Sequence, residues 1–202
     1  MRCRWVSSIS VSLAAFPLTT ASTADSNTAT GEAVSFMASA CAANSVHVSK
    51  WWVFAMMSRD VIESGLRWTW TPQRVLRSVR NPATNTIVAR YGREILGFAI
   101  MQYAEGDENP GAHLALLAVD PARRRHGIAS ALLAWLEVTA RIAGMCRIRV
   151  ETRADNLEAR ALYRKFGYHE AREILGYYQG VDDAVVLMKT LRTDPPQLPS
   201  SG

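Results

Sequence analysis

Apolar and polar residues alternate with clear periods from residue 86 onward, and these periods predict most of the secondary structure. Two β-prone runs, 86–91 and 95–103, are separated by the short polar segment 92–94, which is typical of a β-hairpin. A third run, 113–119, follows a loop that contains glycine and proline. The chain therefore predicts three antiparallel strands in succession.

The clearest helical pattern covers residues 127–143, where apolar side chains recur about every 3.6 residues and Gly144 stops the run. A second helical pattern covers 156–166 and stops at Gly167. Three more β-prone runs lie at 147–151, 168–172 and 184–189. This order of elements predicts a single α/β domain, built on a mixed, mostly antiparallel sheet of about six or seven strands with about four helices.

The pattern is weaker in the first part of this domain. Residues 46–57 predict a first strand that runs toward a helix. Ser58 and Asp60 can cap a helix that continues through Leu66. Residues 71–79 predict a second helix, because a threonine at the N-cap position is followed by a proline at the first helical position.

Both ends of the chain are expected to lie outside the domain. The apolar run 6–18 after two arginines imitates a signal peptide, but serines dilute it and no cleavage triplet follows it directly. Residues 19–44 are small and polar, so they bury too little surface to offset their ordering entropy. We therefore expect a disordered or weakly signal-like extension over 1–45, one folded domain over 46–192 and a loose, proline-rich tail over 193–202.

Composition limits the possible functions. With 202 residues, 49% of them hydrophobic and 20% charged, the chain can bury one sizeable core, which excludes disorder throughout and a fibrous architecture. The net charge is +5 and the longest basic tract is 123–125, so no nucleic-acid partner is predicted, whereas a small polyanion suits this charge. No run approaches the roughly 18 to 20 apolar residues of a membrane span. A soluble protein without a membrane partner is expected.

The cysteines and histidines give no sign of a metal site. Cys3, Cys41 and Cys146 show neither metal-ligand nor paired spacing, which favours a reducing compartment. His113 and His126 are isolated and have no partner at ligand spacing. We therefore predict a cytoplasmic protein without a bound metal.

The strongest candidate for chemistry is the segment 117–130, where a strand ends, turns and opens a helix. Such a turn directs backbone N–H groups and a helix N-terminus at one point, where a pyrophosphate can bind. Gly127 and Ala129 allow close approach of the backbone, and Arg124 and Arg125 add positive charge. Taken alone, the same pattern also fits an ordinary strand–turn–helix connection with solvated arginines.

Residues 124–129 resemble the coenzyme A signature R/Q-x-x-G-x-G/A of the GNAT acetyltransferase superfamily, with alanine at the last position, where glycine is commoner. The resemblance implies the GNAT fold, with a sheet splayed near 117–120 and 150–152, and acetyl-CoA as co-substrate. It implies that the main chain of the strand end pairs with the pantetheine arm, namely Leu117, Ala118 and Val119. It also implies that the pyrophosphate is held by Arg124, Arg125, His126, Gly127, Ile128, Ala129 and Ser130.

A second block resembles the ribosomal-protein-alanine N-acetyltransferases, the RimI-like subgroup. It begins with Val-Glu-Thr-Arg at 150–153, where that subgroup has Leu-Glu-Val-Arg, and continues through Asn156 and Tyr163 to Phe-Gly-Tyr at 166–168. The spacing from Glu151 to Tyr163 matches without a gap. The resemblance covers residues 85–190 and implies a protein N-terminal α-amine as acceptor, such as that of a ribosomal protein.

The residue types in this block suit acetyl transfer to an amine. The amine must lose a proton before it attacks the thioester, which Glu151 can assist directly or through water. Coenzyme A leaves as a thiolate that the Tyr163 hydroxyl can protonate. Asn156 can cap its helix and also reach the pantetheine amides. Nothing near Cys146 resembles an activated nucleophile, so we expect direct attack in a ternary complex.

Several alternatives stay open at this point. Without the resemblance, Glu151 would be interpreted as a solvated or ion-paired residue and Tyr163 as a core tyrosine. The acceptor could be a small-molecule amine such as an aminoglycoside, a polyamine or an amino-acid derivative, and the chain could be a non-catalytic acyl-CoA-binding module. Residues 50–82, where the fold builds its acceptor groove, match the family least. Either a monomer or a homodimer fits the sequence.

Overall fold

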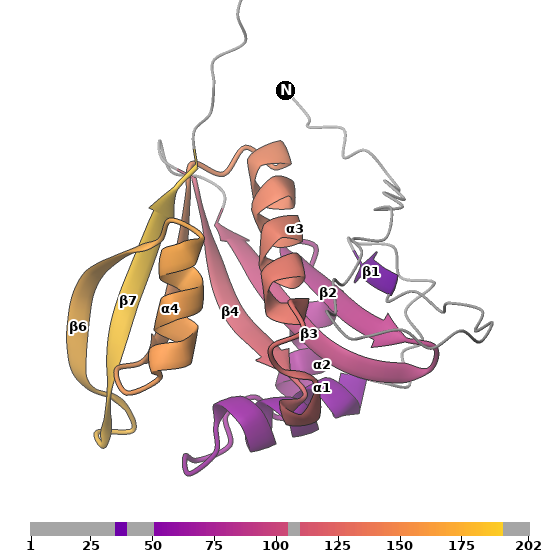
Figure 1. Ribbon diagram of the computed structural model, residues 1–202, viewed down its shortest axis with the longest axis horizontal. Helices are drawn as coiled ribbons and strands as arrows, with labels where there is room; N and C mark the ends of the chain where they lie inside the picture. Colours follow the sequence, from indigo (N-terminus) through magenta and orange to yellow (C-terminus); the bar gives the residue numbers. More distant parts are fainter. Residues whose placement is uncertain (1–34, 40–50, 105–109, 192–202) are drawn as a thin grey trace, which may run out of the picture. The chain divides into compact units, whose positions relative to one another are not determined.

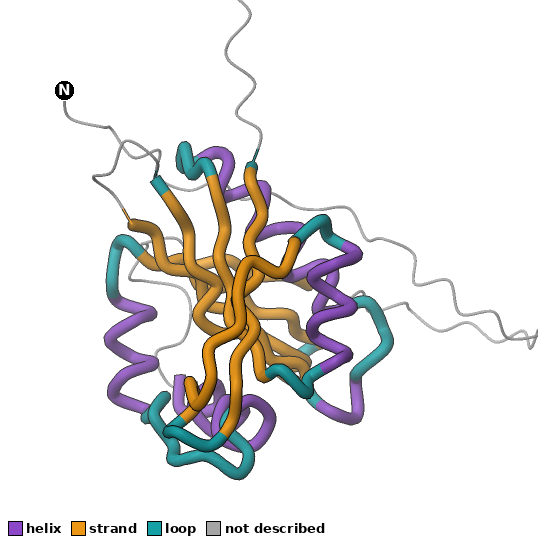
Figure 2. Tube along the Cα trace, turned by 90° about the vertical axis from the view of Figure 1, so that its left-hand side faces the viewer, coloured by secondary structure: helices purple, strands orange, loops and turns teal. Residues whose placement is uncertain are grey.

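The computed structural model describes residues 35–39, 51–104 and 110–191. Figure 1 labels the elements along the chain. Strands in orange are joined by helices in purple in the trace of Figure 2. The elements in chain order are β1 (Ser35–Ser39), α1 (Trp51–Met57), the π-helical turn η2 (Ser58–Ile62), α2 (Pro72–Arg80), β2 (Thr84–Tyr91), β3 (Glu94–Ala104), β4 (Gly111–Val119), the 3-10 turn η3 (Pro121–Arg123), α3 (Ile128–Ile142), β5 (Arg147–Arg153), α4 (Leu157–Lys165), β6 (His169–Tyr178) and β7 (Asp182–Thr190).

The strands follow the order β1-β2-β3-β4-β5-β7-β6 in one seven-stranded sheet. β1 pairs antiparallel with β2, and β7 pairs antiparallel with both β5 and β6, whereas β4 and β5 are parallel. The ladder between β4 and β5 joins residues 111–114 to 147–150. It ends there although β4 continues to Val119 and β5 to Arg153. The predicted mixed, mostly antiparallel sheet is confirmed, and the ladder ends in the region where the splay is predicted.

By its contacts the chain divides into two compact units. The first comprises residues 1–100 and 116–133, and the second comprises 101–115 and 134–202. In the first unit, the rings of Phe54 and Phe98 stack with their centroids 4.8 Å apart. Six successive residues of β2, starting at Thr84, are buried, so this strand is covered on both faces.

The second unit has its own core around β5 and β7. Ile148 and Leu187 are fully buried, because alternate residues of β5 point inward and the middle of β7 is covered. β6 is the outermost strand and is largely exposed, and it forms a long hairpin with β7 (Figure 1). In α4 the side chain of Asn156 accepts a hydrogen bond from Ala159 N at 3.1 Å, and Gly167 follows the helix with φ at 83°.

Two expectations for the first part of the chain are wrong. Residues 51–57 form the helix α1 and not the end of a strand, because a short apolar run does not distinguish a buried helix from a buried strand. Ser58 does not cap a new helix: α1 continues directly into η2, and the Ser58 side chain is buried. The predicted second helix is confirmed as α2, with Thr71 at its N-cap and a proline at its start.

The segment expected to lie outside the domain also contains structure. Residues 35–39 form β1, which pairs with β2 from Ser35 opposite Arg90 to Ser39 opposite Thr86. Composition does not reveal this strand, because an edge strand gains its hydrogen bonds from its partner and not from its own apolar pattern. The remainder of 1–45, the predicted strand at Val46 and Val48, and the tail 193–202 lie outside the described residues.

Candidate active site

The turn between β4 and α3, in the first unit, has the backbone geometry of an anion-binding concavity. Arg125 and Gly127 have positive φ angles of 66° and 77°, whereas φ is −66° at Arg124 and negative at His126. An alternation of φ signs turns successive N–H groups toward the same side, which creates a concave site for an anion. The η3 turn before it is fixed by Asp120, whose side chain accepts a hydrogen bond from Ala122 N at 2.8 Å.

The start of α3 adds further donors to this turn. Ala131 N donates to Gly127 O at 3.0 Å. The N–H groups of residues 128–130 therefore precede the first bond of the helix, where they are open to an external acceptor. A Cβ atom added at Gly127 would meet no atom within 4 Å, so the space beside this backbone is open. These features fit a pyrophosphate.

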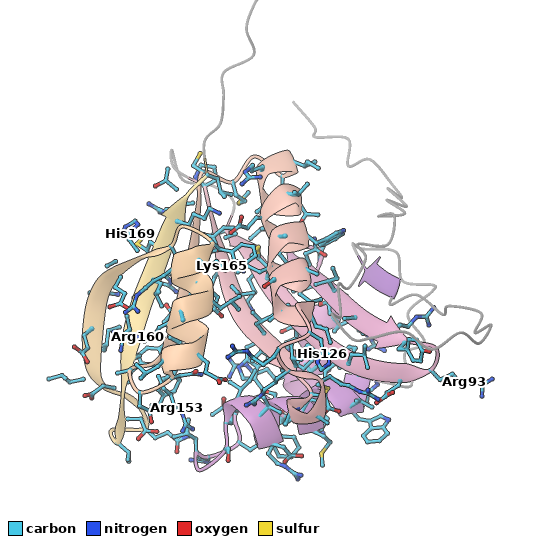
Figure 3. The ribbon with its side chains drawn as sticks, in the orientation of Figure 1. Arg93, His126, Arg153, Arg160, Lys165 and His169 are labelled. Atoms are coloured by element: carbon cyan, nitrogen blue, oxygen red, sulfur yellow. The ribbon has the colours of Figure 1, made fainter. Side chains whose placement is uncertain are left out.

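His126 supports the shape of the turn. Its Nδ1 lies 2.7 Å from Arg124 O and 3.2 Å from Arg123 O, and Figure 3 labels the side chain near the N-terminal end of α3. Because a carbonyl oxygen only accepts hydrogen bonds, Nδ1 is the protonated nitrogen and Nε2 is the acceptor in the neutral ring. The structure thus gives His126 a bracing contact within the turn.

Positive charge at the turn is available to a ligand. Arg123 pairs with Glu94 at 3.3 Å. Arg124 and Arg125 are exposed, and their guanidinium groups form no ion pair within the described part of the chain. Arginine binds phosphate oxygens through paired N–H groups. The residues present at the turn therefore fit the phosphates of acetyl-CoA.

The strand end that precedes the turn is held by β3. A Cβ atom at Gly97 would lie 2.8 Å from Ala118 O and 3.2 Å from Val119 Cγ2, so a larger residue could not approach so closely. Asp120 N donates to Leu96 O at 2.9 Å. These contacts fix the main chain of 117–119.

In the second unit, Glu151 of β5 is held by two basic side chains. Its Oε2 lies 2.6 Å from His113 Nε2, and its Oε1 lies 2.9 Å from Arg149 Nε. The strand register explains both contacts: His113 of β4 is opposite Arg149, and Glu151 lies two residues further along the same face of β5. Since the β4–β5 ladder ends at Val150, Glu151 is the first residue of β5 beyond it.

These partners keep Glu151 ionised. Its side chain is only 8% exposed, and burial by itself raises the pKa of the carboxyl. The hydrogen bond with His113 and the electrostatic effects of His113 and Arg149 act in the opposite direction and prevail, so the pKa of Glu151 lies below its ordinary value. The carboxylate is therefore charged at neutral pH, and it is a weak base when it acts alone.

Two tyrosines belong to the same cluster in the second unit. Tyr163 of α4 is buried, and its burial, with a smaller effect of Tyr178, raises the pKa of its hydroxyl above the ordinary value. Burial raises the pKa of Tyr178 to about 12, and Tyr177 and the negative charge of Glu151 contribute to this. Tyr178, which is half-buried, thus interacts electrostatically with both Glu151 and Tyr163, and both tyrosines keep their protons at neutral pH.

Sequence reasoning missed the pairing of His113 with Glu151, because it treated His113 as an isolated histidine. The available signal was that the two residues lie in adjacent predicted β-prone runs. A parallel pairing of those runs can place them on one face, but the register decides whether it does. Asn156 caps α4 by accepting a hydrogen bond from Ala159 N.

The described ranges contain neither a metal-binding cluster nor a membrane-spanning helix. No group of three or more His, Cys, Asp or Glu side chains there is arranged to hold a metal ion. None of the helices there has the length and apolar character that crossing a membrane requires.

Known proteins resemble this chain in sequence. NAA20 of Arabidopsis thaliana, the catalytic subunit of N-terminal acetyltransferase B complex, is 32% identical over 51% of this chain and 60% of its own length. The ribosomal protein bS18-alanine N-acetyltransferase of Escherichia coli strain K12 is 34% identical over 46% of this chain and 63% of its own length. The chain thus spans less than two thirds of the length of these relatives.

A solved structure shares the fold. The ribosomal-protein-S18-alanine N-acetyltransferase from Escherichia coli aligns with a TM-score of 0.63 at 22% identity, over 81% of this chain and 99% of that one. The sequence also matches the Acetyltransferase (GNAT) family over residues 50–168. The resemblance carried by the two motifs is confirmed, and this chain belongs to the Acetyltransferase (GNAT) family.

Proposed function

We propose that this chain transfers the acetyl group of acetyl-CoA to the α-amine of a protein N-terminus, by direct attack within a ternary complex. The observation that carries the proposal is the 2.6 Å contact between His113 Nε2 and Glu151 Oε2. It joins an imidazole, a side chain that commonly acts as a general base, to a carboxylate that stays ionised. An amine that must be deprotonated before it attacks requires such a base.

The turn after β4 would hold the co-substrate. Bound acetyl-CoA supplies an acetyl group activated as a thioester. The N–H groups of 125–130 and the guanidinium groups of Arg124 and Arg125 would bind its pyrophosphate, and the main chain of 117–119 would pair with its pantetheine arm. Asn156 is proposed to contact the pantetheine amides in addition to capping α4.

The proton of the attacking ammonium would move to His113. An ionised carboxylate only accepts hydrogen bonds, so His113 Nε2 donates to Glu151 and the lone pair of the neutral ring lies on Nδ1. Nδ1 then receives the proton, and the adjacent negative charge of Glu151 stabilises the imidazolium that forms. In this proposal Glu151 assists proton removal through His113, which offsets its own low basicity.

Tyr163 would supply a proton to the sulfur that leaves. Its hydroxyl is protonated at neutral pH, because burial raises its pKa. A hydroxyl positioned in this way can donate to a thiolate as the carbon–sulfur bond breaks.

Two observations support an α-amine as acceptor. One relative named above is the catalytic subunit of an N-terminal acetyltransferase complex, and the other is an alanine N-acetyltransferase of a ribosomal protein. An α-amine has an ordinary pKa of about 7.7 to 8.0, against about 10.4 for lysine, so it gives up its proton more readily to an imidazole.

A panel of acceptors tests the proposal. One peptide has a free α-amine and no lysine, and its matched control has a blocked α-amine and one lysine; a polyamine and an aminoglycoside complete the panel. We expect thiol release and the mass gain of one acetyl group with the first peptide only. A higher kcat/KM for any other amine would contradict the acceptor.

The same samples test the remaining alternatives. A rise in Tm with acetyl-CoA, without transfer to any amine, would indicate a non-catalytic acyl-CoA-binding module. If acetyl-CoA does not raise Tm at all, the assignment of the turn as its binding site is wrong.

A further inference from the structure

The exposed face of α2, in the first unit, borders an open hollow of about 480 Å³. The residues that line it all belong to that unit, and they are Gln73, Leu76, Arg77, Arg80, Asn81 and Pro82. Gln73, Arg77 and Arg80 are exposed, and their spacing of four and three residues places them in one row along the helix. A row of long polar side chains therefore borders the hollow.

The two arginines of this row are available to a ligand. Arg77 and Arg80 form neither an ion pair nor a side-chain hydrogen bond within the described ranges. Like charges three residues apart on a helix repel each other, and an anion bound beside both would offset this repulsion. A basic residue near a helix C-terminus also complements the helix dipole, but this effect does not explain the hollow that both residues line.

The described residues of the first unit carry an excess of positive charge. They include ten arginines and four acidic residues, whereas those of the second unit include nine basic and eight acidic residues. The four acidic side chains have partners other than the α2 arginines: Asp60 pairs with Arg59, Glu63 with Thr69 and Trp70, Glu94 with Arg123, and Asp120 with Ala122. The field of this unit therefore attracts an anionic partner.

Asn81 adds a hydrogen-bond donor whose orientation is fixed. Its Oδ1 accepts a hydrogen bond from Ala83 N at 2.9 Å, so its NH2 group is left to donate. Guanidinium groups also only donate. The polar lining thus consists mainly of donors, and Leu76 and Pro82 add apolar surface beside them. A ligand with several acceptor oxygens fits this lining.

Among such ligands, an acidic peptide fits the hollow best. None of the six lining residues is aromatic, so a nucleobase would have no ring on which to stack. The row from Gln73 to Arg80 is about 10 Å long, which is roughly the length of three residues of an extended chain. A small free anion would contact only part of the row and stay in water, where a single charge pair contributes little.

We propose that this hollow binds an acidic peptide segment of a partner protein, in which two carboxylate side chains separated by one residue pair with Arg77 and Arg80. Side chains two residues apart on an extended chain point to the same side, about 7 Å apart. The Cβ atoms of Arg77 and Arg80 are separated by about 5 to 6 Å, and the long arginine side chains bridge the difference. The segment binds through carboxylates and presents no amine, so it is distinct from the acetyl acceptor.

Peptides blocked at both ends test this proposal, because they have no free amine to acetylate. The test peptide has two glutamates separated by one serine. One control has the same composition with adjacent glutamates, which point to opposite sides of an extended chain, and a second has glutamines. Titration of the ¹⁵N-labelled full chain, with and without saturating acetyl-CoA, follows the amides of 73–82 by NMR. We expect the test peptide to bind at least about fivefold more tightly than either control, in both conditions.

Variants of α2 locate the contact. Arg77→Gln and Arg80→Gln should each weaken binding of the test peptide by about fivefold, the effect of losing one charge pair. Arg74→Gln is the matched control, because it removes the same charge from the same helix. The Arg74 guanidinium lies 4.2 Å from the ring centroid of Trp70 and does not line the hollow. Its affinity should stay within about twofold of the wild type.

Several outcomes would overturn the proposal. These are equal affinity for the two glutamate peptides, an affinity unchanged in both arginine variants, and the absence of shifts at 73–82. Tighter binding of inorganic phosphate or of a single-stranded oligonucleotide than of the test peptide would also overturn it, because the occupant would then be a phosphate. The proposed acetyltransferase function is tested by other measurements, and a protein that acetylates no amine would leave this result unaffected.

Discussion

The turn after β4 and the cluster around Glu151 are both proposed to act in acetyl transfer, but they are built in different ways. The turn uses backbone N–H groups of consecutive residues, 125–130, in a segment shaped by alternating φ angles. The cluster uses side chains from four elements, namely His113 of β4, Glu151 of β5, Tyr163 of α4 and Tyr178 of β6. A site made of backbone is encoded locally, whereas a site made of side chains depends on strand register.

This difference affects how substitutions act. Several N–H groups share the binding of a phosphate, so each arginine of the turn contributes only a part. In the cluster, one oxygen of Glu151 faces one nitrogen of His113, so a single contact carries the interaction. We therefore expect large losses of activity in the cluster and graded losses of co-substrate affinity at the turn.

The largest effect is expected for Glu151→Gln. The amide has no charge to stabilise a proton on His113, so kcat/KM for the acceptor should fall by about 100- to 1,000-fold in a thiol-release assay. The rise in Tm with acetyl-CoA should persist. Glu158→Gln, an exposed position of α4, is the control. If acetyl-CoA no longer raised the Tm of Glu151→Gln, the cluster would also take part in binding acetyl-CoA, which would contradict the different roles proposed for the two regions.

Tyr163→Phe should reduce kcat by about 10- to 100-fold, because it removes the proposed proton donor while the ring remains. Steady-state kinetics at saturating peptide measure this change. Tyr168→Phe is a matched control, since Tyr168 is also buried and its ring centroid lies 5.5 Å from that of Tyr163. Equal losses in the two variants would attribute the effect to packing.

His113→Gln should reduce kcat by about tenfold or more, since the proposed proton acceptor is lost. His113→Gln should also raise the pKa of Glu151. Burial raises this pKa, and in the variant Arg149 still lowers it, while glutamine at position 113 lowers it less than histidine does. ¹³C NMR titration of the Glu151 carboxyl measures this shift directly. An unchanged pKa would show that His113 does not hold the carboxylate in its charged form.

The lowered pKa of Glu151 also determines how the stability of the protein depends on pH. A carboxyl whose pKa is lowered by folding stabilises the protein above its unfolded pKa, and this stabilisation is lost as pH falls through the folded pKa. Glu151 should therefore stabilise the wild type at neutral pH and lose this effect in acid. In His113→Gln the loss should begin at a higher pH, as Tm measured between about pH 6 and pH 3 would show.

Arg125→Gly should weaken the binding of acetyl-CoA without lowering the stability of the protein. The loss of one guanidinium should raise KM for acetyl-CoA by about five- to tenfold. Glycine adopts the positive φ of 66° without the cost of about 1 kcal/mol that an L-residue carries there, so Tm should not fall. Arg125→Ala is the comparison, since it removes the charge and keeps the strain. A lower Tm for glycine than for alanine would contradict this account of the turn.

The smallest effect is expected for Asn156→Ala. It removes the hydrogen bond from Ala159 N and should cost about 1 kcal/mol of unfolding free energy. Urea unfolding measures this cost, and Asn156→Asp should largely keep the unfolding free energy of the wild type, because aspartate also accepts the hydrogen bond at the N-cap. The KM for acetyl-CoA decides whether Asn156 also contacts pantetheine: a value equal to that of the wild type would limit Asn156 to its role as a cap.

Predictions from sequence succeeded where the deciding interactions are local. The helix expected over 156–166 is α4, with Asn156 as its cap and a glycine after its end. Thr71 and the following proline start α2 as their order indicates. The predictions failed at 51–57, where a short apolar run fits either a helix or a strand, and at 35–39, where pairing with β2 forms the strand.

The sequence by itself determined the family and the turn. Both depend on residue types at fixed short spacings, and neighbours in the chain suffice to set the dihedral angles and the first turn of α3. Only the tertiary structure decided that Glu151 is ionised and paired. Its pKa results from burial and from His113, a residue 38 positions away in the chain, which the register of two parallel strands places within 2.6 Å.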